Sequence, residues 1–473
     1  MNLTLKRLPL LLVATALLTG CQLMPTKFII APKYVKPAAP IPEKFPVATD
    51  TADKPVADIG WRDFFQHPEL QAAIGTALDN NRDLKMAALR IDEARALYNV
   101  TQADRLPGVN ATGGVTTSRQ LLFGTTPTNR TVYQVGASIP AFELDLYGRV
   151  KNLSDAALAQ FFATEEARRT VQITLVGEVA KAWLSERALA EQMQLATRSL
   201  QAREASYVLV KKRLDAGITN ALELRQSDTL VQSARVSLLA VKRQHAQSSN
   251  ALALLVGTST QAASATATLS AQNITADFAA GLPSELLTQR PDIIASEQKL
   301  RASQANIAAA RAAFFPRIAL TAGVGLASTS LSDLFSSGAN TWSFAPLISL
   351  PIFDGGRNQS NLSVAEVRSN IAINEYEKTI QVAFREVADA LAARAIINEE
   401  IAAQQAALQA QSERLALAQA RYQNGIANYL EVLDAERELF ASEQQLLQTR
   451  LLRLTNAVDL YRSLGGGLNE ASQ

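Results

Sequence analysis

Residues 213–223 read Arg213-Leu-Asp-Ala-Gly217-Ile-Thr-Asn220-Ala-Leu-Glu223. The pattern of this stretch returns 208 residues later as Arg421-Tyr-Gln-Asn-Gly425-Ile-Ala-Asn428-Tyr-Leu-Glu431. The offset holds without a gap from Arg149 to Gly257, and an offset of 209 continues it upstream. A register kept over this length indicates an internal duplication. We therefore predict two tandem copies of one unit.

Long segments without helix breakers flank each copy of this stretch. No proline lies between Pro140 and Pro283, and none follows Pro351. Apolar residues recur there at alternating three- and four-residue spacing, which is typical of coiled coils. We predict a long helical hairpin over residues 149–257 and a second one over 357–465.

Each predicted hairpin turns at a glycine, Gly217 or Gly425. Glycine readily adopts the left-handed conformation that ends a helix. Asn220 and Asn428 follow, and asparagine is a strong N-cap for the returning helix. The sequence therefore predicts tight, polar turns at the tips of two long rods.

Segments with a period of two precede each hairpin, within residues 107–144 and 316–353. Their length of about ten residues suits a tilted crossing of a bilayer, and one face carries small or polar residues, which suits a water-filled lumen. An ordinary antiparallel sheet with one buried face would show the same alternation. Four strands cannot close a barrel and open edges in lipid are costly, so we expect a barrel shared among several chains. The aromatic residues expected at the membrane belt are Tyr133, Trp342 and Phe344.

The first twenty residues predict a secretory signal peptide. Lys6 and Arg7 precede an apolar run of about eleven residues, which is too short to span a bilayer. Cys21, the only cysteine, follows directly and resembles the lipidated cysteine of a bacterial lipobox. That resemblance implies cleavage before Cys21 and a covalent lipid on its sulfur, and Gln22 after it favours the outer membrane. A free buried thiol is the alternative.

The charge of the chain argues against nucleic acid as a partner. Removal of residues 1–20 takes away two cations and no anion, so the net charge falls from +2 to 0. A balanced chain lacks the basic surface that binds phosphates. The two histidines, His67 and His245, lie far apart in the sequence. We therefore expect no metal site and no cofactor other than the lipid.

Several motifs, in this order and spacing, resemble the TolC superfamily, in its lipoprotein branch typified by OprM. They include Gly60-Trp61-Arg-Asp-Phe64-Phe65, Phe142-Glu-Leu-Asp-Leu-Tyr-Gly148-Arg149, Arg290-Pro291-Asp292-Ile293, Arg311-Ala-Ala-Phe-Phe-Pro316 and Leu350-Pro351-Ile-Phe353-Asp-Gly355-Gly356-Arg357.

The resemblance implies an α plus transmembrane-β fold. A homotrimer would close a twelve-stranded barrel from four strands per chain, and the barrel would continue into a periplasmic α-helical coiled-coil barrel with an equatorial collar. The implied partners are a periplasmic adaptor protein, an inner-membrane resistance-nodulation-division transporter and the lipid of a Gram-negative outer membrane. The implied function is the exit duct of a multidrug efflux pump, which passes drugs and other toxic compounds through a gate at the helical tips.

The resemblance also implies gate residues near the second tip. Leu430 and Asp434 match aliphatic and acidic constricting positions, and Glu431 stands beside them. A ring of like-charged carboxylates would favour cations. Tyr422 matches a tyrosine that links neighbouring coils, with Glu223 as its expected partner. The alternative for the two acidic residues is solvated carboxylates near an N-cap, stabilised by the helix dipole. The residues expected to contact the adaptor are Arg213, Gly217, Asn220, Arg421, Gly425 and Asn428.

Three other classes of protein share some of these features. No nucleophile elbow, phosphate-binding loop, zinc-ligand spacing or dinucleotide fingerprint occurs in the sequence, so we do not expect an enzyme. A periplasmic adaptor would lack two tandem hairpins. The exit duct of a type I protein-secretion system would share nearly every feature and stays open as the alternative.

The sequence predicts six consecutive parts. The chain would begin with a signal peptide (1–20), a lipidated N-terminal segment (21–60) and a first repeat (61–257) with helices over 61–106. A linker (258–282), a second repeat (283–465) with a helix over 284–315, and a C-terminal tail (466–473) would follow.

Overall fold

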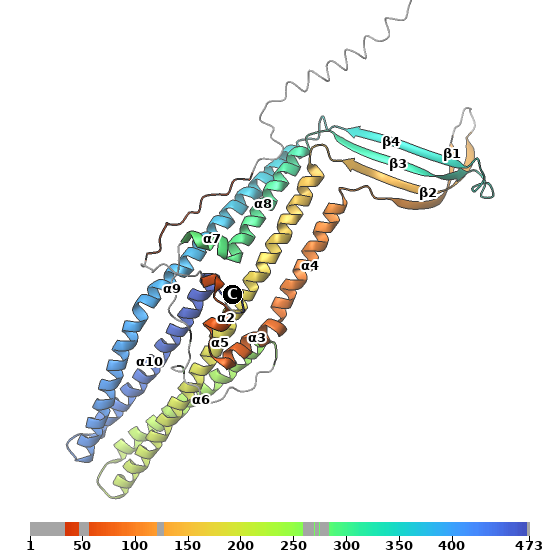
Figure 1. The fold of residues 1–473 in the computed structure, drawn as a ribbon. Coiled ribbons are helices and arrows are strands. Elements are labelled where there is room, and N and C mark those ends of the chain that lie inside the picture. Colours follow the sequence, from red (N-terminus) through yellow and green to blue (C-terminus); the bar gives the residue numbers. More distant parts are fainter. Residues whose placement is uncertain are drawn as a thin grey trace, which may run out of the picture. The chain divides into compact units, whose positions relative to one another are not determined.

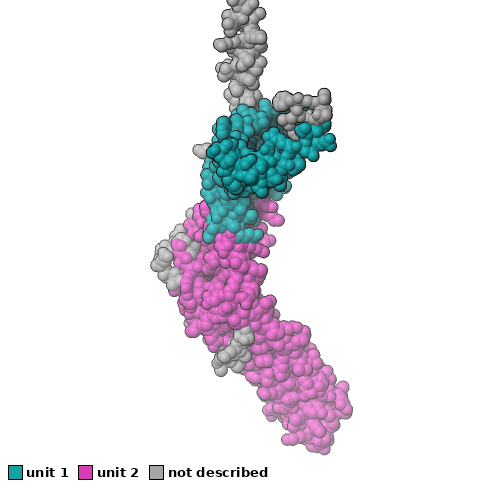
Figure 2. Space-filling view, turned by 90° about the vertical axis from the view of Figure 1, so that its right-hand side faces the viewer, with its two compact units in different colours: residues 1–37, 93–161, 298–374 teal, residues 38–92, 162–297, 375–473 magenta. Residues whose placement is uncertain are grey.

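The computed structural model describes residues 34–46, 56–120, 127–258, 269, 274 and 283–470. The signal peptide and Cys21 therefore lie outside the described residues, as does most of the 258–282 linker. The chain forms two compact units, which Figure 2 shows in teal and magenta. Residues 93–161 and 298–374 build most of the first unit, and residues 56–92, 162–258, 283–297 and 375–470 build most of the second.

The first unit holds one antiparallel sheet with the strand order β1-β2-β3-β4 (Figure 1). A register shift interrupts the pairing of β2 with β3 between Ile139 and Phe142, and elsewhere the register is regular, with Gly136 opposite Gly325. The strands are β1 (Asn110–Gln120), β2 (Thr128–Leu144), β3 (Arg317–Ser328) and β4 (Asn340–Ser349).

The sheet has two free edges among the described residues, because β1 pairs only with β2 and β4 only with β3. Strand β4 is solvent-exposed at all ten positions. Trp342 is 81% exposed and Phe344 60% exposed, although both are large and apolar. An exposed apolar edge is ready to pair with another chain.

The helices repeat between the two halves. The first hairpin of α5 and α6 and the second hairpin of α9 and α10 have first helices of equal length, 67 residues. α4 and α8 both have 22 residues. The predicted duplication is thus confirmed. The long helices are α4 (Arg82–Ala103), α5 (Arg149–Asp215), α6 (Ala221–Val256), α8 (Pro291–Ala312), α9 (Arg357–Gln423) and α10 (Tyr429–Ser463). The short ones are η2 (Val56–Asp58), α2 (Trp61–Phe64), α3 (Pro68–Asn80), η4 (Pro283–Glu285) and α7 (Leu286–Gln289).

No helix in the described part of the chain is long and apolar enough to cross a membrane.

One contact recurs at equivalent positions of the two copies. The Asn81 side chain donates to the Leu255 carbonyl at 2.9 Å, and Arg290 donates to the Ser463 carbonyl at 2.9 Å. Each bond ties the residue before α4 or α8 to the end of the returning hairpin helix. Because those helix ends carry carbonyls without an intrahelical partner, the bonds satisfy acceptors that burial would otherwise leave unpaired.

The single helix expected over 284–315 is broken in the structure. Arg290 is extended and separates α7 from α8, which begins at Pro291. Proline disfavours a helical conformation in the residue before it and is well tolerated in the first turn of a helix. The freed Arg290 side chain forms ion pairs with Asp292 at 2.6 Å and Glu386 at 2.8 Å.

In the second unit an aromatic core brings residues 59–64, near the N-terminus, together with the C-terminal segment. The rings of Phe64 and Tyr461 stack at 4.0 Å, and the Tyr461 hydroxyl donates to the Ile59 carbonyl at 2.6 Å. The Trp61 amide donates to the Asn469 carbonyl at 2.9 Å. The N- and C-terminal segments therefore pack against the end of α10, as the expected collar requires.

Candidate gate at the hairpin tips

Both tips turn through a left-handed glycine. Gly217 has φ +74° and Gly425 has φ +73°, and the Ile218 and Ile426 amides donate back to the carbonyls of Arg213 and Arg421. An added Cβ would meet nothing within 4 Å at either glycine. The glycines are therefore required by backbone conformation and not by lack of space.

Asparagine caps the returning helix at each tip, as expected. The Asn220 side chain accepts from the Glu223 amide at 3.1 Å, and Asn428 accepts from the Glu431 amide at 3.3 Å. Each cap satisfies one of the free amides of a first helical turn.

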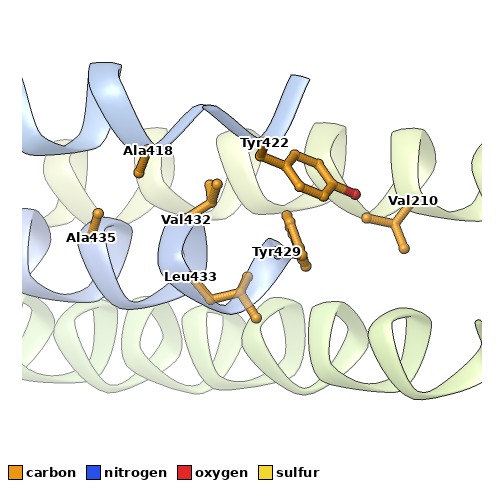
Figure 3. Packing of buried hydrophobic residues seen from close by; sticks show 7 residues of the cluster. All are labelled: Val210, Ala418, Tyr422, Tyr429, Val432, Leu433 and Ala435. Atoms are coloured by element: carbon orange, nitrogen blue, oxygen red, sulfur yellow. The ribbon is translucent and has the colours of Figure 1, made fainter. Parts of the chain in front are cut away.

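A buried apolar cluster joins the two hairpins just behind the tips (Figure 3). Figure 3 shows the Tyr422 ring directed from the end of α9 toward Val210 on α5. Tyr429, the first residue of α10, lies 5.1 Å from Tyr422, measured between ring centroids. The cluster consists of Val210, Ala418, Tyr422, Tyr429, Val432, Leu433 and Ala435.

Tyr422 is held by apolar and cationic contacts. The Arg213 guanidinium lies 4.5 Å from its ring centroid. Burial raises the pKa of Tyr422, with Arg213 opposing and Glu223 adding to that rise. Within the described chain its hydroxyl has no hydrogen-bond partner. Within one chain, the Glu223 carboxylate accepts from the Thr219 hydroxyl of its own tip. The expected link from Tyr422 to Glu223 between neighbouring coils stays a prediction.

The acidic gate residues are paired with arginines. Asp434 lies 2.5 Å from Arg414 on α9 and 2.7 Å from Arg437 on its own helix. Glu431 lies 3.5 Å from Arg421. These pairs are about half exposed, so each contributes little to stability. Within one chain, Asp434 and Glu431 therefore each have at least one arginine beside them.

Leu430, in the first turn of α10, is not part of the buried cluster. Its side chain is 57% exposed, whereas its neighbours Tyr429 and Val432 are 3% exposed. An exposed leucine at a tip is available to contact another chain or a lumen.

A second polar contact lies one layer further from the tip. Burial raises the pKa of Glu436 and lowers the pKa of Arg203, and the opposite charge of each opposes the shift of the other. The Arg203 guanidinium lies 5.8 Å from the Phe440 ring centroid and donates to the Leu230 carbonyl at 3.3 Å. These residues couple α5 to α10 and to α6.

Several residues of the tip site were not predicted from the sequence. Arg437 stands three positions after Asp434, a spacing that places both on one helix face and could have been recognised. Arg414 is twenty residues before Asp434, and only the hairpin brings them together. Tyr429 has no aromatic counterpart in the first repeat, where the equivalent residue is Ala221.

The remaining predicted residues lie outside this site. Trp342 and Phe344 are on β4 and Tyr133 is on β2, opposite Ser328. Among the described residues no group of three or more histidine, cysteine or acidic side chains could hold a metal ion.

Comparison with known proteins gives matches along nearly the whole chain. Residues 73–258 and 282–466, one segment in each repeat, match the family described as outer membrane efflux protein. The probable outer membrane lipoprotein SilC of Salmonella typhimurium is 41% identical over 98% of this chain and 99% of its own length. The antibiotic efflux pump outer membrane protein ArpC of Pseudomonas putida is 41% identical over 98% of this chain and 96% of its own.

A third relative has a solved structure. The cation efflux system protein CusC of Escherichia coli K12 is 43% identical over 95% of this chain and 97% of its own length. A crystal structure of CusC, from a study of folding and transmembrane channel formation, covers 92% of this chain and 99% of its own with a TM-score of 0.83.

Proposed function

The chain belongs to the outer membrane efflux protein family, and from this premise we propose that it acts as a homotrimer that forms the exit duct of a tripartite multidrug efflux pump. The chain is an outer-membrane channel of an efflux system with a TolC-like fold, as predicted, and the prediction that it is no enzyme is confirmed. The trimer, its partners, its gate and its substrates are the parts that we propose.

The free edges of the sheet support a barrel shared among several chains, and this is the observation that carries the proposal. In the described chain β1 and β4 each lack a neighbour on one side, and lipid offers no hydrogen bonds to satisfy them. Pairing β1 of one copy with β4 of the next removes both edges. Three copies then supply twelve strands, an even number within the range of outer-membrane barrels.

The hairpin tips are the part that we assign to the periplasmic gate. Leu430 is exposed beside a buried cluster that fixes the position of the second hairpin. Three copies of Leu430 would form an apolar constriction, and Asp434 would hold Arg414 and Arg437 around it. The tip surfaces around Arg213, Gly217, Asn220, Arg421, Gly425 and Asn428 would meet the periplasmic adaptor, which joins the duct to a resistance-nodulation-division transporter.

The substrates that we propose are drugs and other toxic compounds of varied chemistry. ArpC is named for antibiotics and CusC for cations, so the family scaffold serves more than one class of substrate. The duct does no chemistry on them. In this chain Asp434 and Glu431 at the second tip are each paired with an arginine, which supports a path without strong cation selectivity.

The lipid anchor on Cys21 is a separate proposal. SilC, a relative over the full length, is named as a lipoprotein. The test is metabolic labelling with radioactive palmitate in a Gram-negative host. Wild-type protein should take up label and Cys21→Ser should not, and labelling of both would place the lipid elsewhere.

The exit-duct proposal is tested in a strain that lacks its own duct but keeps a matching transporter and adaptor. The chain should restore low accumulation of a fluorescent dye, and cross-linking of intact cells should give a trimer. A monomer, or cells that stay loaded with dye, would contradict the proposal. Export of a secreted protein without dye efflux would assign the chain to type I secretion.

A further inference from the structure

We propose that Arg213 is a positioning residue for the gate, because its guanidinium clamps Tyr422 of the second hairpin while Thr219 keeps Glu223 from competing for it. This inference rests on the proposed gate at the tips. It concerns one specific contact between the two hairpins of a chain. The proposed contact can be wrong while the proposal of an exit duct is right.

The two tips carry the same pair of charged residues but use it differently. Arg213 and Glu223 are equivalent to Arg421 and Glu431 by the 208-residue offset. At the second tip, Arg421 lies 3.5 Å from Glu431, a pair within one hairpin. At the first tip no such pair occurs among the described residues, since the Glu223 carboxylate accepts from Thr219.

The difference has a visible cause in the sequence. The residue equivalent to Thr219 at the second tip is Ala427, which has no hydroxyl. Glu431 pairs with its arginine, whereas the Thr219 hydroxyl holds the Glu223 carboxylate within its own turn. The Arg213 guanidinium contacts a partner outside its own hairpin.

That partner is an aromatic ring found only in the second repeat. Arg213 lies 4.5 Å from the ring centroid of Tyr422, and the equivalent residue in the first repeat is Leu214. Tyr422 is 7% exposed and packs on Val210 of α5. Its hydroxyl has no partner in the described chain, so the ring face and not the hydroxyl is what the first hairpin binds.

The clamp therefore opposes movement of the second hairpin away from the first. A guanidinium over a ring is stabilising, and more so where water is excluded, as it is beside a buried tyrosine. Any opening that separates α9 from α5 must break this contact once in each chain. Loss of the clamp should shift the closed-to-open ratio about 2- to 30-fold per chain, the range for cation–π contacts from exposed to desolvated sites.

The first test compares single-channel recordings of wild type, Arg213→Met and Thr219→Ala in planar bilayers. Arg213→Met keeps the length of the side chain but removes the cation, and should raise the open fraction. Thr219→Ala releases Glu223 to draw Arg213 away, and should raise it too. Thr229→Ala is the matched control, because its hydroxyl donates only to the Arg225 carbonyl of its own helix at 2.9 Å. An unchanged open fraction in both test variants overturns the proposal.

A second set of variants separates the clamp from a general loss of packing. Adding Glu223→Gln to Thr219→Ala removes the competing carboxylate and should restore wild-type gating. Arg213→Lys, which keeps a cation, should fall between wild type and Arg213→Met. Arg213→Met and Tyr422→Leu combined should have no more effect than either alone. Additive effects of Arg213→Met and Tyr422→Leu on the open fraction, or no rescue by Glu223→Gln, would show that Arg213 acts only through packing and would contradict the clamp.

The outcomes also distinguish the clamp proposal from the gate proposal on which it rests. If Leu430→Ala changes conductance and the clamp variants do not, the gate stands and the clamp is wrong. If no tip variant of an inserted trimer changes conductance, the gate assignment itself is wrong.

Discussion

Replacing Gly136 by alanine should weaken the sheet, because the register places this glycine directly opposite Gly325 on the neighbouring strand. A Cβ built on Gly136 would lie 2.5 Å from the Val324 carbonyl oxygen and 2.9 Å from the Gly325 Cα. Non-bonded contacts of Cβ atoms shorter than 3.0 Å are essentially never found, so β2 and β3 must part by about 0.5 Å. That shift stretches hydrogen bonds of about 2.9 Å to about 3.4 Å, at the limit of useful geometry.

The magnitude follows from the bonds next to the pair. Two backbone hydrogen bonds weakened at about 0.5–1.5 kcal/mol each give about 1–3 kcal/mol per chain. If three chains share one barrel, the loss is about 3–9 kcal/mol for the assembly. The assay is the temperature at which half of the purified trimers dissociate in detergent, followed by gel electrophoresis without prior boiling.

Strand β1 supplies the control. Gly114 is also a strand glycine, but an added Cβ there meets nothing within 4 Å. Gly114→Ala should leave the dissociation temperature close to wild type, whereas Gly136→Ala and Gly325→Ala should both lower it clearly. Equal effects at Gly114 and Gly136 would refute the argument, since they would show that the register between β2 and β3 is not the one described.

Three further predictions concern single side chains. Asn220→Ala and Asn428→Ala each remove a helix cap worth about 1 kcal/mol, so hydrogen exchange of the first turns of α6 and α10 should become several-fold faster than in the neighbouring helix. Burial lowers the pKa of His67 below 6.5, so the unfolded chain takes up the proton first as the pH falls. The thermal midpoint of the wild type should therefore decrease as the pH is lowered below about 6.5, and His67→Phe should reduce that decrease. Equal slopes of thermal midpoint against pH in the two proteins would contradict this prediction. Arg290→Met leaves Asp292 and Glu386 without their cation and should cost about 3–5 kcal/mol in the free energy of unfolding by urea, whereas Arg385→Met, at an exposed ion pair, should cost less than about 1 kcal/mol.

The regular parts of this fold could be predicted from the sequence because they are local or repeated. Gly217 and Gly425 determine the turns through their backbone conformation, and Asn220 and Asn428 determine the caps through bonds to residues three positions away. The absence of proline sets the length of the helices. The 208-residue offset then carries each of these inferences from one half to the other.

The contacts between elements could not be predicted in the same way. Arg414 reaches Asp434 only because α9 and α10 are antiparallel at a particular rotation, and that rotation depends on side-chain packing. The bond from the Thr219 hydroxyl to the Glu223 carboxylate was not predicted either, and the expected link from Tyr422 to Glu223 stays a prediction. His67 and His245, far apart in the sequence, both lie against one stretch of α5, at Trp183 and Glu186 respectively.

The central claim is that the chain forms a duct whose narrowest point is the second hairpin tip. The most direct test is the single-channel conductance of lipidated trimers in planar bilayers, comparing wild type with Leu430→Ala plus Asp434→Ala. We predict small currents for the wild type and much larger ones for the double variant, because it removes the exposed leucine and the carboxylate that holds Arg414 and Arg437. Trimers that insert but conduct alike would contradict the claim and place the constriction elsewhere.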